Sequence, residues 1–438
     1  MYLRFFMVLL AALVIPAEGA ELSREPRELL NLYGIDDSQL AGLADRQPWQ
    51  ADEDEILMRI LYRLPSVRSQ DFQRWAQPLD SRVLFEDPSS HRGLVYRLQG
   101  HAVSVEALEL QPEMTQRLGL ERYYRVEIEL DNGGRAAIFA RDVPEAWTKI
   151  ADLSEPAAAI GFFLKIGQQP DGEPMPILVA PRIQWFPPSL LGRLGMDVGL
   201  LDDIRRQQIA QSPQGTASGI DIRKLRLTGK DREAFYQMLA AVGRAEPGLL
   251  LRESRKRLAA SGRDSFSVVP LFNQPHEQVG ELVALSGTAR RIIPITVDDE
   301  EIRQRLGIQQ YYEIYLFTDD SQGNPLVFCV RDLPPGMPIG EGARFGENTV
   351  IAGFFFKTWA YRRTSQDTPT EAQWQLAPLL IGCEPVWNPA PPPPANTMME
   401  VIAGGVFVLV LAGLFALVWA YGRSDRRARR FTIGRNPP

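Results

Sequence analysis

The sequence predicts an α+β protein with two tandem units, each a helical segment followed by a five-stranded antiparallel barrel or open sheet, and one C-terminal transmembrane helix. Three observations predict this architecture. The chain of 438 residues contains an internal repeat, each copy has amphipathic helical stripes ahead of short apolar runs, and 21 residues near the C-terminus carry no charge.

Residues 1–20 have the pattern of a secretory signal peptide. Arg4 precedes an apolar run from Phe5 to Ile15, and Pro16 then leads into small residues at cleavage-site spacing. The run is too short to cross a bilayer, which needs about 20 apolar residues. We therefore expect export and place the fold in the residues that follow.

The internal repeat is visible in four matched segments that keep the same order in both copies. They are GLVYRLQGHA at Gly93 and GELVALSGTA at Gly280, RLGLERYYRVEIEL at Arg117 and RLGIQQYYEIYLF at Arg305, IFARDVP at Ile138 and FCVRDLP at Phe328, and GFFLK at Gly161 and GFFFK at Gly353. An Ala-Pro pair, Ala180-Pro181 or Ala377-Pro378, then leads to Trp185 or Trp387. We infer a tandem duplication.

Each copy begins with helices. Apolar residues recur on one helical face in both copies, at Ile56, Leu57, Ile60, Leu61 and Leu64 and at Ala234, Phe235, Met238, Leu239 and Val242. These stripes predict core-facing helices. The predicted units are helical segments over 21–80 and 189–265, and strand domains over 81–188 and 266–389.

Five strand-like runs follow the helices in each copy. A glycine inside the first run, Gly100 or Gly287, permits a bulge and a sharp bend. The second run alternates apolar and charged side chains from Tyr124 to Leu130, which is typical of a half-buried strand. We expect a helix over 145–153 in the first copy, whereas prolines and glycines exclude one from 334–348 of the second.

In number and order these strands resemble the oligonucleotide/oligosaccharide-binding (OB) barrel. The whole chain resembles membrane-anchored bacterial envelope proteins that carry a duplicated OB-like domain. The resemblance implies a fold and a usual place for ligands, but no reaction. The alternative is an open antiparallel sheet with the helices packed on one face.

The C-terminal part has the pattern of a membrane anchor. A proline-rich stalk over 390–399 precedes a transmembrane helix over 400–421 and a basic tail over 422–438. The arginines of the tail predict that it is cytoplasmic and that the ectodomain is extracytoplasmic. Small residues at Ala412, Ala416 and Ala420 permit a homodimer through this helix.

Charge and motifs limit the function classes. The whole chain carries −6, of which the tail contributes +5, leaving −11 for the ectodomain, so nucleic acid is a poor partner. His91, His101 and His276 lack ligand spacing, and we expect no metal or cofactor. We predict no catalytic residues, since no hydrolase, nucleotide-binding or redox motif appears, although a new kind of enzyme could lack them all.

One set of chemically suggestive residues recurs in both copies. It consists of Tyr123, Arg141, Asp142 and Lys165 in the first copy and Tyr311, Arg331, Asp332 and Lys357 in the second. These residues form a candidate ligand rim if they meet in one cleft. Alternatively, Arg and Asp pair at a strand end and the tyrosines fill the core.

The leading functional hypothesis is a binding or scaffold role outside the cytoplasm, with a protein or a glycan as partner. The alternatives are an envelope enzyme acting on cell-wall or secreted substrates and a purely structural spacer. Convergence of Arg141, Asp142, Lys165 and Tyr123 in one open cleft would favour the enzyme, and burial would favour scaffold or binding.

Cys329 and Cys383 are the only cysteines, and both lie in the second copy. On the third and fifth strands of an OB-like barrel they would be on neighbouring strands. An exported chain permits a disulfide between them, and two buried thiols are the alternative.

Overall fold

The computed structural model describes residues 25–169, 171–210, 225–342, 344–363, 373–389, 405–419 and 421. The predicted signal peptide, stalk and basic tail lie outside the described residues. The chain divides into two compact units, Met1–Trp387 and Asn388–Pro438, and both β-sheets belong to the first. The predicted α+β class, with two β units, is confirmed.

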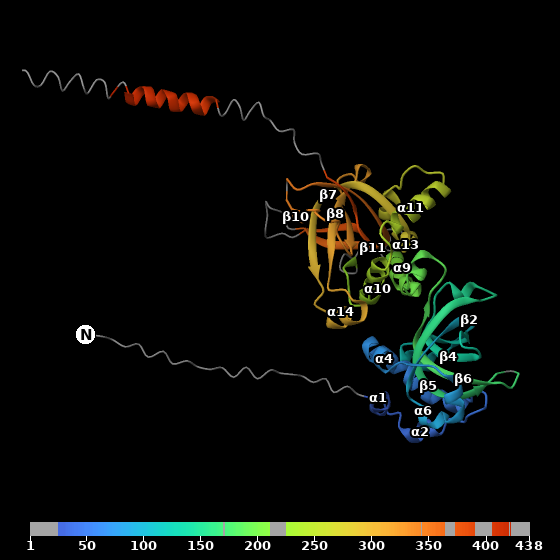
Figure 1. Cartoon of the computed structure of the whole chain (residues 1–438). Coiled ribbons are helices and arrows are strands. Elements are labelled where there is room, and N and C mark those ends of the chain that lie inside the picture. Colours follow the sequence, from blue (N-terminus) through green and yellow to red (C-terminus); the bar gives the residue numbers. More distant parts are fainter. Residues whose placement is uncertain are drawn as a thin grey trace, which may run out of the picture. The chain divides into compact units, whose positions relative to one another are not determined.

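Short helices precede the first sheet (Figure 1). They are α1 (Pro26–Leu32), α2 (Asp37–Ala41), α3 (Asp54–Arg63), α4 (Ser69–Trp75), α5 (Ser81–Glu86) and α6 (Pro88–His91), with single 3-10 turns at η1 (Ala51–Glu53) and η2 (Leu64–Ser66). Helix α2 begins where the Asp36 carboxylate accepts the Gln39 amide. Along α3 the predicted stripe buries Leu57, Ile60 and Leu61.

The first sheet is a closed five-stranded barrel with one added short strand. Its strands are β1 (Gln77–Pro78), β2 (Val95–Glu109), β3 (Arg122–Leu130), β4 (Arg135–Asp142), β5 (Glu155–Gln168) and β6 (Pro174–Trp185). The order is β1-β2-β3-β4-β6-β5, and pairing of β2 with β5 closes the barrel.

The expectation of a wholly antiparallel sheet is wrong, because β4 and β6 run parallel within the barrel and the added β1 pairs parallel with β2. Strand β5 is antiparallel to β2, and β6 is antiparallel to β5. Strand β6 therefore runs in the same direction as β2 and β4, so the barrel is mixed.

The second sheet repeats this cyclic order. Its strands are β7 (Leu282–Thr296), β8 (Gln310–Phe317), β9 (Leu326–Val330), β10 (Gly340–Glu341), β11 (Glu347–Arg363), β12 (Gln373–Gly382) and β13 (Val386–Asn388). They lie in the order β10-β7-β8-β9-β12-β11-β13, with a further pairing of β7 with β11. Strands β7, β8, β9, β11 and β12 thus correspond to β2, β3, β4, β5 and β6.

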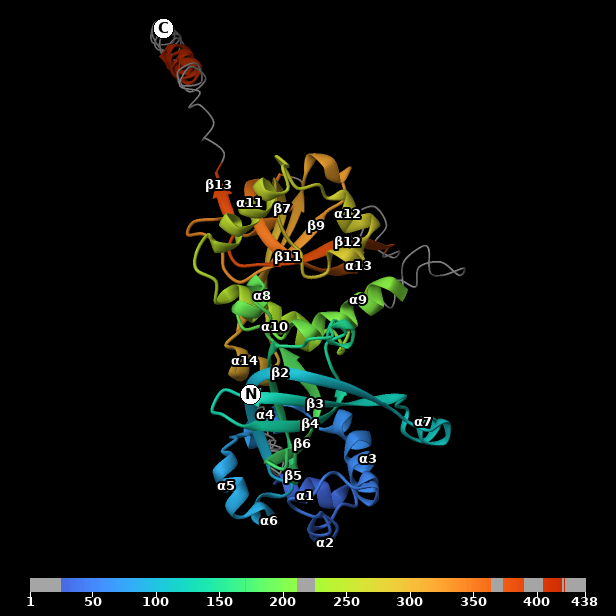
Figure 2. The ribbon, with the colours of Figure 1, turned by 90° about the vertical axis from the view of Figure 1, so that its right-hand side faces the viewer.

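Helices also precede and connect the second sheet. They are α8 (Leu190–Arg193), η4 (Val198–Leu200), α9 (Leu201–Ala210), α10 (Arg232–Gly243), α11 (Leu249–Ala260), α12 (Val269–Asn273) and α13 (Pro275–Gln278). Equivalent helices join the first two strands of each barrel, α7 (Pro112–Leu118) and α14 (Glu300–Leu306), and η6 (Asp319–Ser321) joins β8 to β9. Figure 2 shows β2 and β3 extending together as an arm towards α7.

The glycine in the first strand of each barrel has the predicted effect. Strand β2 pairs with β5 as far as Ala102 and with β3 from Gly100 onward, and its bulge follows Ala102. A Cβ on Gly100 would lie 1.9 Å from the carbonyl oxygen of Glu129, and one on Gly287 would lie 2.3 Å from that of Phe317. Only glycine lets the neighbouring backbone come so close.

Two separate cores stabilise the first barrel and its helices. One fills the barrel, with Leu98, Val126 and Ile138 among its members. The other lies between the helices and the outside of the barrel, where Leu57 of α3 and Phe139 of β4 belong to one cluster. Figure 2 shows α1 and α3 beside the barrel strands. The barrel therefore buries part of its outer surface as well as its interior.

Two details differ from the sequence analysis. The helix expected over 145–153 is a single 3-10 turn, η3 (Trp147–Lys149), whose Trp147 fills the barrel end. The Ala-Pro match is out of phase, because strand register makes Val179 equivalent to Ile381. The tryptophan match holds: the Trp185 indole donates to Glu155 (2.9 Å) and the Trp387 indole to Glu347 (2.7 Å).

Residues 405–419 of the predicted membrane helix are helical, whereas 400–404 and 420 lie outside the described residues. Within the described residues, no helix has the length and apolar character that a membrane crossing requires.

Candidate functional site

Lys165 is buried between the barrel and its helices. It lies on β5 with no exposed surface, and its Nζ is 2.7 and 2.6 Å from the two carboxylate oxygens of Glu53. The same ammonium donates to the Pro48 carbonyl (3.3 Å) and lies 5.5 Å from the Trp49 ring centre. This lysine is therefore committed to an internal ion pair.

The Glu53 carboxylate is fully used. Besides Lys165, its oxygens accept the backbone amides of Ala44 (3.1 Å) and Gln50 (2.8 Å). Glu53 ends η1, directly before α3. A buried ion pair survives only when hydrogen bonds replace the lost water, and here they also fix the chain that enters α3.

Lys357 occupies the equivalent place on β11. It is fully buried, and its Nζ lies 3.3 Å from Oδ2 of Asp231, the residue that precedes α10. The Gln207 side-chain oxygen (3.1 Å) and the Arg226 carbonyl (3.4 Å) accept from the same ammonium. Burial lowers the pKa of Lys357, and the Asp231 charge opposes that shift.

The two predicted tyrosines are buried against the same helices. Tyr123 packs on Phe139, whose ring also meets Trp49 at 4.8 Å between centroids, and Tyr311 packs on Phe235 of α10. Burial raises the pKa of Tyr123 to about 12 and also raises that of Tyr311. The outer faces of the second and third strands are therefore covered by the preceding segment of the same chain, through Trp49 in the first copy and Phe235 in the second.

The Arg-Asp pairs lie at the ends of the third strands. Arg141 is half-buried and donates to the Leu61 carbonyl of α3 (2.9 Å), and Arg331 donates to the Gln310 carbonyl (3.3 Å). Asp142 and Asp332 are exposed. The structure therefore separates the predicted set: the lysines and tyrosines face the helices, and the aspartates face solvent.

A hollow of about 620 Å³ opens beside Asp142 at the end of the first barrel. We call it the barrel-end hollow. Ala107 and Tyr124 are among the residues that line it. Charged residues of both signs make up much of its wall: Arg122, Arg141, Arg182, Arg206, Glu121, Asp142, Glu145, Asp202 and Asp203.

Internal bonds fix much of the barrel-end hollow. Arg206 of α9 forms ion pairs with Glu145 and Asp203, and Asp202 accepts the Glu145 amide (2.9 Å). The surrounding wall of the hollow desolvates the Asp142 carboxyl and raises its pKa, and the Arg182 charge opposes the shift. The hollow thus presents Asp142 on a fixed charged wall.

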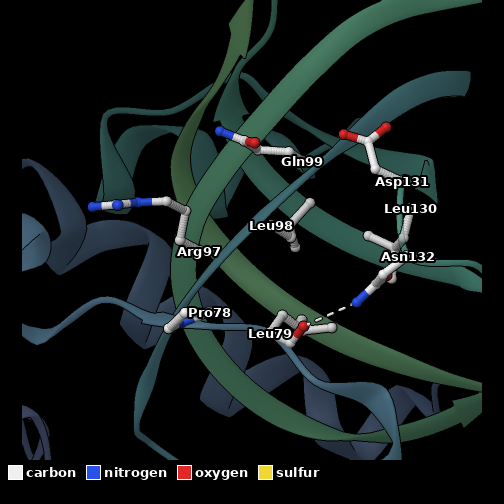
Figure 3. A pocket seen from close by; sticks show the side chains of 8 residues that line it. All are labelled: Pro78, Leu79, Arg97, Leu98, Gln99, Leu130, Asp131 and Asn132. Atoms are coloured by element: carbon white, nitrogen blue, oxygen red, sulfur yellow. Dashed lines mark hydrogen bonds between the residues drawn. The ribbon is translucent and has the colours of Figure 1, made fainter.

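A smaller pocket of about 360 Å³ lies where β1 meets β2 (Figure 3). The Asn132 amide donates to the Leu79 carbonyl across it (3.3 Å). Figure 3 shows the Arg97 guanidinium pointing away from the Asp131 carboxylate, so the two charges do not converge on one ligand position.

Cys329 lies on β9 and Cys383 directly follows the neighbouring strand β12, and both are free thiols. Cys329 pairs in register with Ile381, which places Cys383 two residues further along. The structure therefore has two thiols rather than a bridge, and burial raises the pKa of each.

Within the described ranges, no group of three or more His, Cys, Asp or Glu residues could hold a metal ion. No protein-family model matches the chain, and no match was found among curated proteins. The site is therefore interpreted from its own chemistry.

Sequence reasoning missed the two carboxylates that hold the lysines. Glu53 and Asp231 each lie three residues before the first residue of an apolar helical stripe, Ile56 or Ala234. An acid repeated at the same place in both copies, together with a lysine inside an apolar strand, was the available signal.

Proposed function

We propose that this chain is a single-pass membrane protein whose duplicated OB-like barrels bind a protein partner outside the cytoplasm. The cyclic strand order and the closing pairings of β2 with β5 and β7 with β11 support OB-like barrels in both copies. The proposed anchor is 400–421, with the arginine-rich tail 422–438 in the cytoplasm.

One observation carries the choice of binding over catalysis. Lys165 and Tyr123 are buried against the helices, whereas Asp142 faces the barrel-end hollow. The four groups that an Arg/Asp/Lys/Tyr active site would require do not share a cleft. A set divided in this way supports binding or scaffolding, because acid-base catalysis needs its groups within reach of one substrate.

The barrel-end hollow favours a protein over a glycan. Its wall alternates guanidinium and carboxylate groups, and such a pattern complements a surface that also carries both charges. Tyr124 is the one aromatic residue among those that line it, and it is only partly exposed. Stacking of sugar rings therefore has little surface here.

The duplication supplies a matched pair of variants for the test. Asp142 and Asp332 are both exposed and occupy equivalent strand ends, but Asp142 lines the barrel-end hollow. The full chain carrying an affinity tag would be crosslinked in its native envelope and purified as wild type, Asp142→Lys and Asp332→Lys. The captured protein would then be made pure and its affinity for each chain measured.

We expect one protein to bind the wild-type chain and Asp332→Lys equally, and Asp142→Lys at least tenfold more weakly. A glycan in place of a protein would overturn the partner class. Capture of nothing, or turnover of a cell-wall fragment by the pure chain, would overturn the binding role.

A further inference from the structure

One strand edge is open in the first barrel and occupied in the second. Beyond Ala102, β2 pairs with β3 on one side, and no described strand pairs with its other side up to Glu109. An open edge presents unpaired N–H and C=O groups, which are a template for another strand.

In the second barrel, the equivalent edge is paired with a short strand. By register Ser104 and Val105 are equivalent to Arg291 and Ile292 of β7. There the short strand β10 pairs antiparallel with β7, with Gly340 opposite Ile292 and Glu341 opposite Arg291. The chain therefore adds a strand of its own at this place in one copy and not in the other.

Charge accompanies the added strand in the second barrel. Arg291 and Glu341 face each other across β7 and β10 and form an ion pair at 3.0 Å. Cross-strand pairs of opposite charge stabilise a sheet by roughly 0.2–1 kcal/mol. The strand that lies on β7 thus carries the charge opposite to that of its neighbour.

The open edge of β2 carries the reverse charge. Glu106 and Glu109 lie along it with side chains 60% and 77% exposed, and each forms one long ion pair with an arginine of β3, at 4.0 Å. They are three residues apart and so point to opposite faces of the sheet. A strand added here would meet a carboxylate on each face.

We propose that the β2 edge from Ser104 to Glu109 binds an extended, cationic peptide segment of the protein partner as an added strand. This inference rests on the proposed binding role and names the kind of segment involved. Main-chain hydrogen bonds give such a segment affinity, and lysine or arginine side chains opposite Glu106 and Glu109 give it register. Ala107 of this edge also lines the barrel-end hollow, so the segment would enter beside Asp142.

The test uses the full chain in detergent and a labelled peptide, acetyl-Lys-Val-Thr-Lys-Val-Thr-Lys-amide, whose lysines repeat every three residues. Fluorescence anisotropy would measure its affinity for wild type, for Glu106→Lys with Glu109→Lys, and for Glu113→Lys. Glu113 is exposed on α7 of the same arm but lies off the edge. A second peptide, methylated on alternate backbone amides, keeps the charge and removes strand pairing.

We expect the first peptide to bind wild type and Glu113→Lys alike, the double variant to bind at least tenfold more weakly, and the methylated peptide not to bind. Failure of the first peptide to bind wild type, or equal binding by the double variant or of the methylated peptide, would overturn the inference. Unchanged thermal unfolding of the double variant verifies that it is folded. If the double variant still captures the partner from the envelope, the partner does not bind at the β2 edge, and the proposed binding role is unaffected.

Discussion

The carboxylates that pair with the buried lysines are more fully hydrogen-bonded in the first barrel than in the second. In the first, both oxygens of Glu53 accept from Lys165 and each accepts one backbone amide as well. In the second, Oδ2 of Asp231 accepts from Lys357 and Thr228, while Oδ1 has no hydrogen-bond partner among the described residues. The position of the ion pair is repeated, but its hydrogen bonds are not.

This difference shows what the duplicated fold requires. A cation on the fourth barrel strand and an acid ahead of the helix recur in both copies, so each barrel is attached to its helices at the same point. The other hydrogen-bond acceptors around the lysine differ between the copies, since Lys357 also donates to the Gln207 side chain and the Arg226 carbonyl. Equivalent substitutions should therefore have unequal effects.

The largest effect is expected for Glu53→Gln. The glutamine amide removes the charge opposite buried Lys165. Its NH₂ group would also face N–H donors that now donate to a carboxylate oxygen of Glu53. Breaking one side of a buried ion pair costs about 3–5 kcal/mol of folding free energy. Chemical denaturation of the full chain would measure it.

The control for that prediction replaces both partners, Glu53→Leu with Lys165→Met. Apolar groups of similar volume leave no buried charge, so much of the lost stability should return. A loss below about 1 kcal/mol in Glu53→Gln would contradict the role of this pair as a buried, fully bonded contact.

Asp231→Asn also removes the charge opposite a buried lysine, but its effect should be smaller, near the lower end of the about 3–5 kcal/mol that breaking a buried ion pair costs. The new N–H₂ group can take the place of Oδ1, where no bond is lost, while the remaining oxygen still accepts from Thr228 and Lys357. The same denaturation experiment checks it. Equal losses in Asp231→Asn and Glu53→Gln would show that the difference in hydrogen bonding has no energetic consequence.

A still smaller effect is expected in the part of the folding stability that Lys357 makes dependent on pH. Its pKa in the folded chain lies below the ordinary 10.5, so between these two values the unfolded chain binds more protons. The wild type should therefore gain stability relative to Lys357→Met as pH rises towards 10.5. Denaturation at several pH values from 7 to 10 tests this, and a difference that is flat or falls with pH would contradict it.

The least perturbing test concerns the thiols. Burial raises the pKa of both, and Cys329 is buried whereas Cys383 is partly exposed. The denatured, unreduced chain should show two free thiols, and in the native chain iodoacetamide should label Cys383 before Cys329. Mass spectrometry of the labelled peptides decides it. A count of zero free thiols would establish the disulfide that the structure lacks.

Local patterns predicted most of the fold. The glycines in the first strands, the alternation in β3 and the helical stripes are properties of neighbouring residues, and the structure uses them as expected. The parallel pairing of β4 with β6 was missed, because direction follows from barrel closure rather than from local pattern. The Ala-Pro match failed for a related reason: register is set by pairing between distant strands.

The site was less predictable. Each residue of the candidate rim was recognised, but which face of the barrel it occupies depends on where the helices pack. Lys165 was included in the candidate rim because it recurs as Lys357 in the second copy. Its partner Glu53 lies 112 residues earlier, so only the tertiary structure joins them.

In both copies, helices of the same chain pack on the outside of the strands and share a hydrophobic core with them. Native-state amide hydrogen exchange of the full chain tests it directly, comparing α3 and α10 with the strands they cover. We predict that amides of α3 and α10 are as protected as those of β6 and β12, the strands they contact, since the helices and the strands open together. Exchange in either helix faster than in its strands by a factor on the order of 10³ would contradict it, because the helix would then leave the strands uncovered without unfolding the barrel.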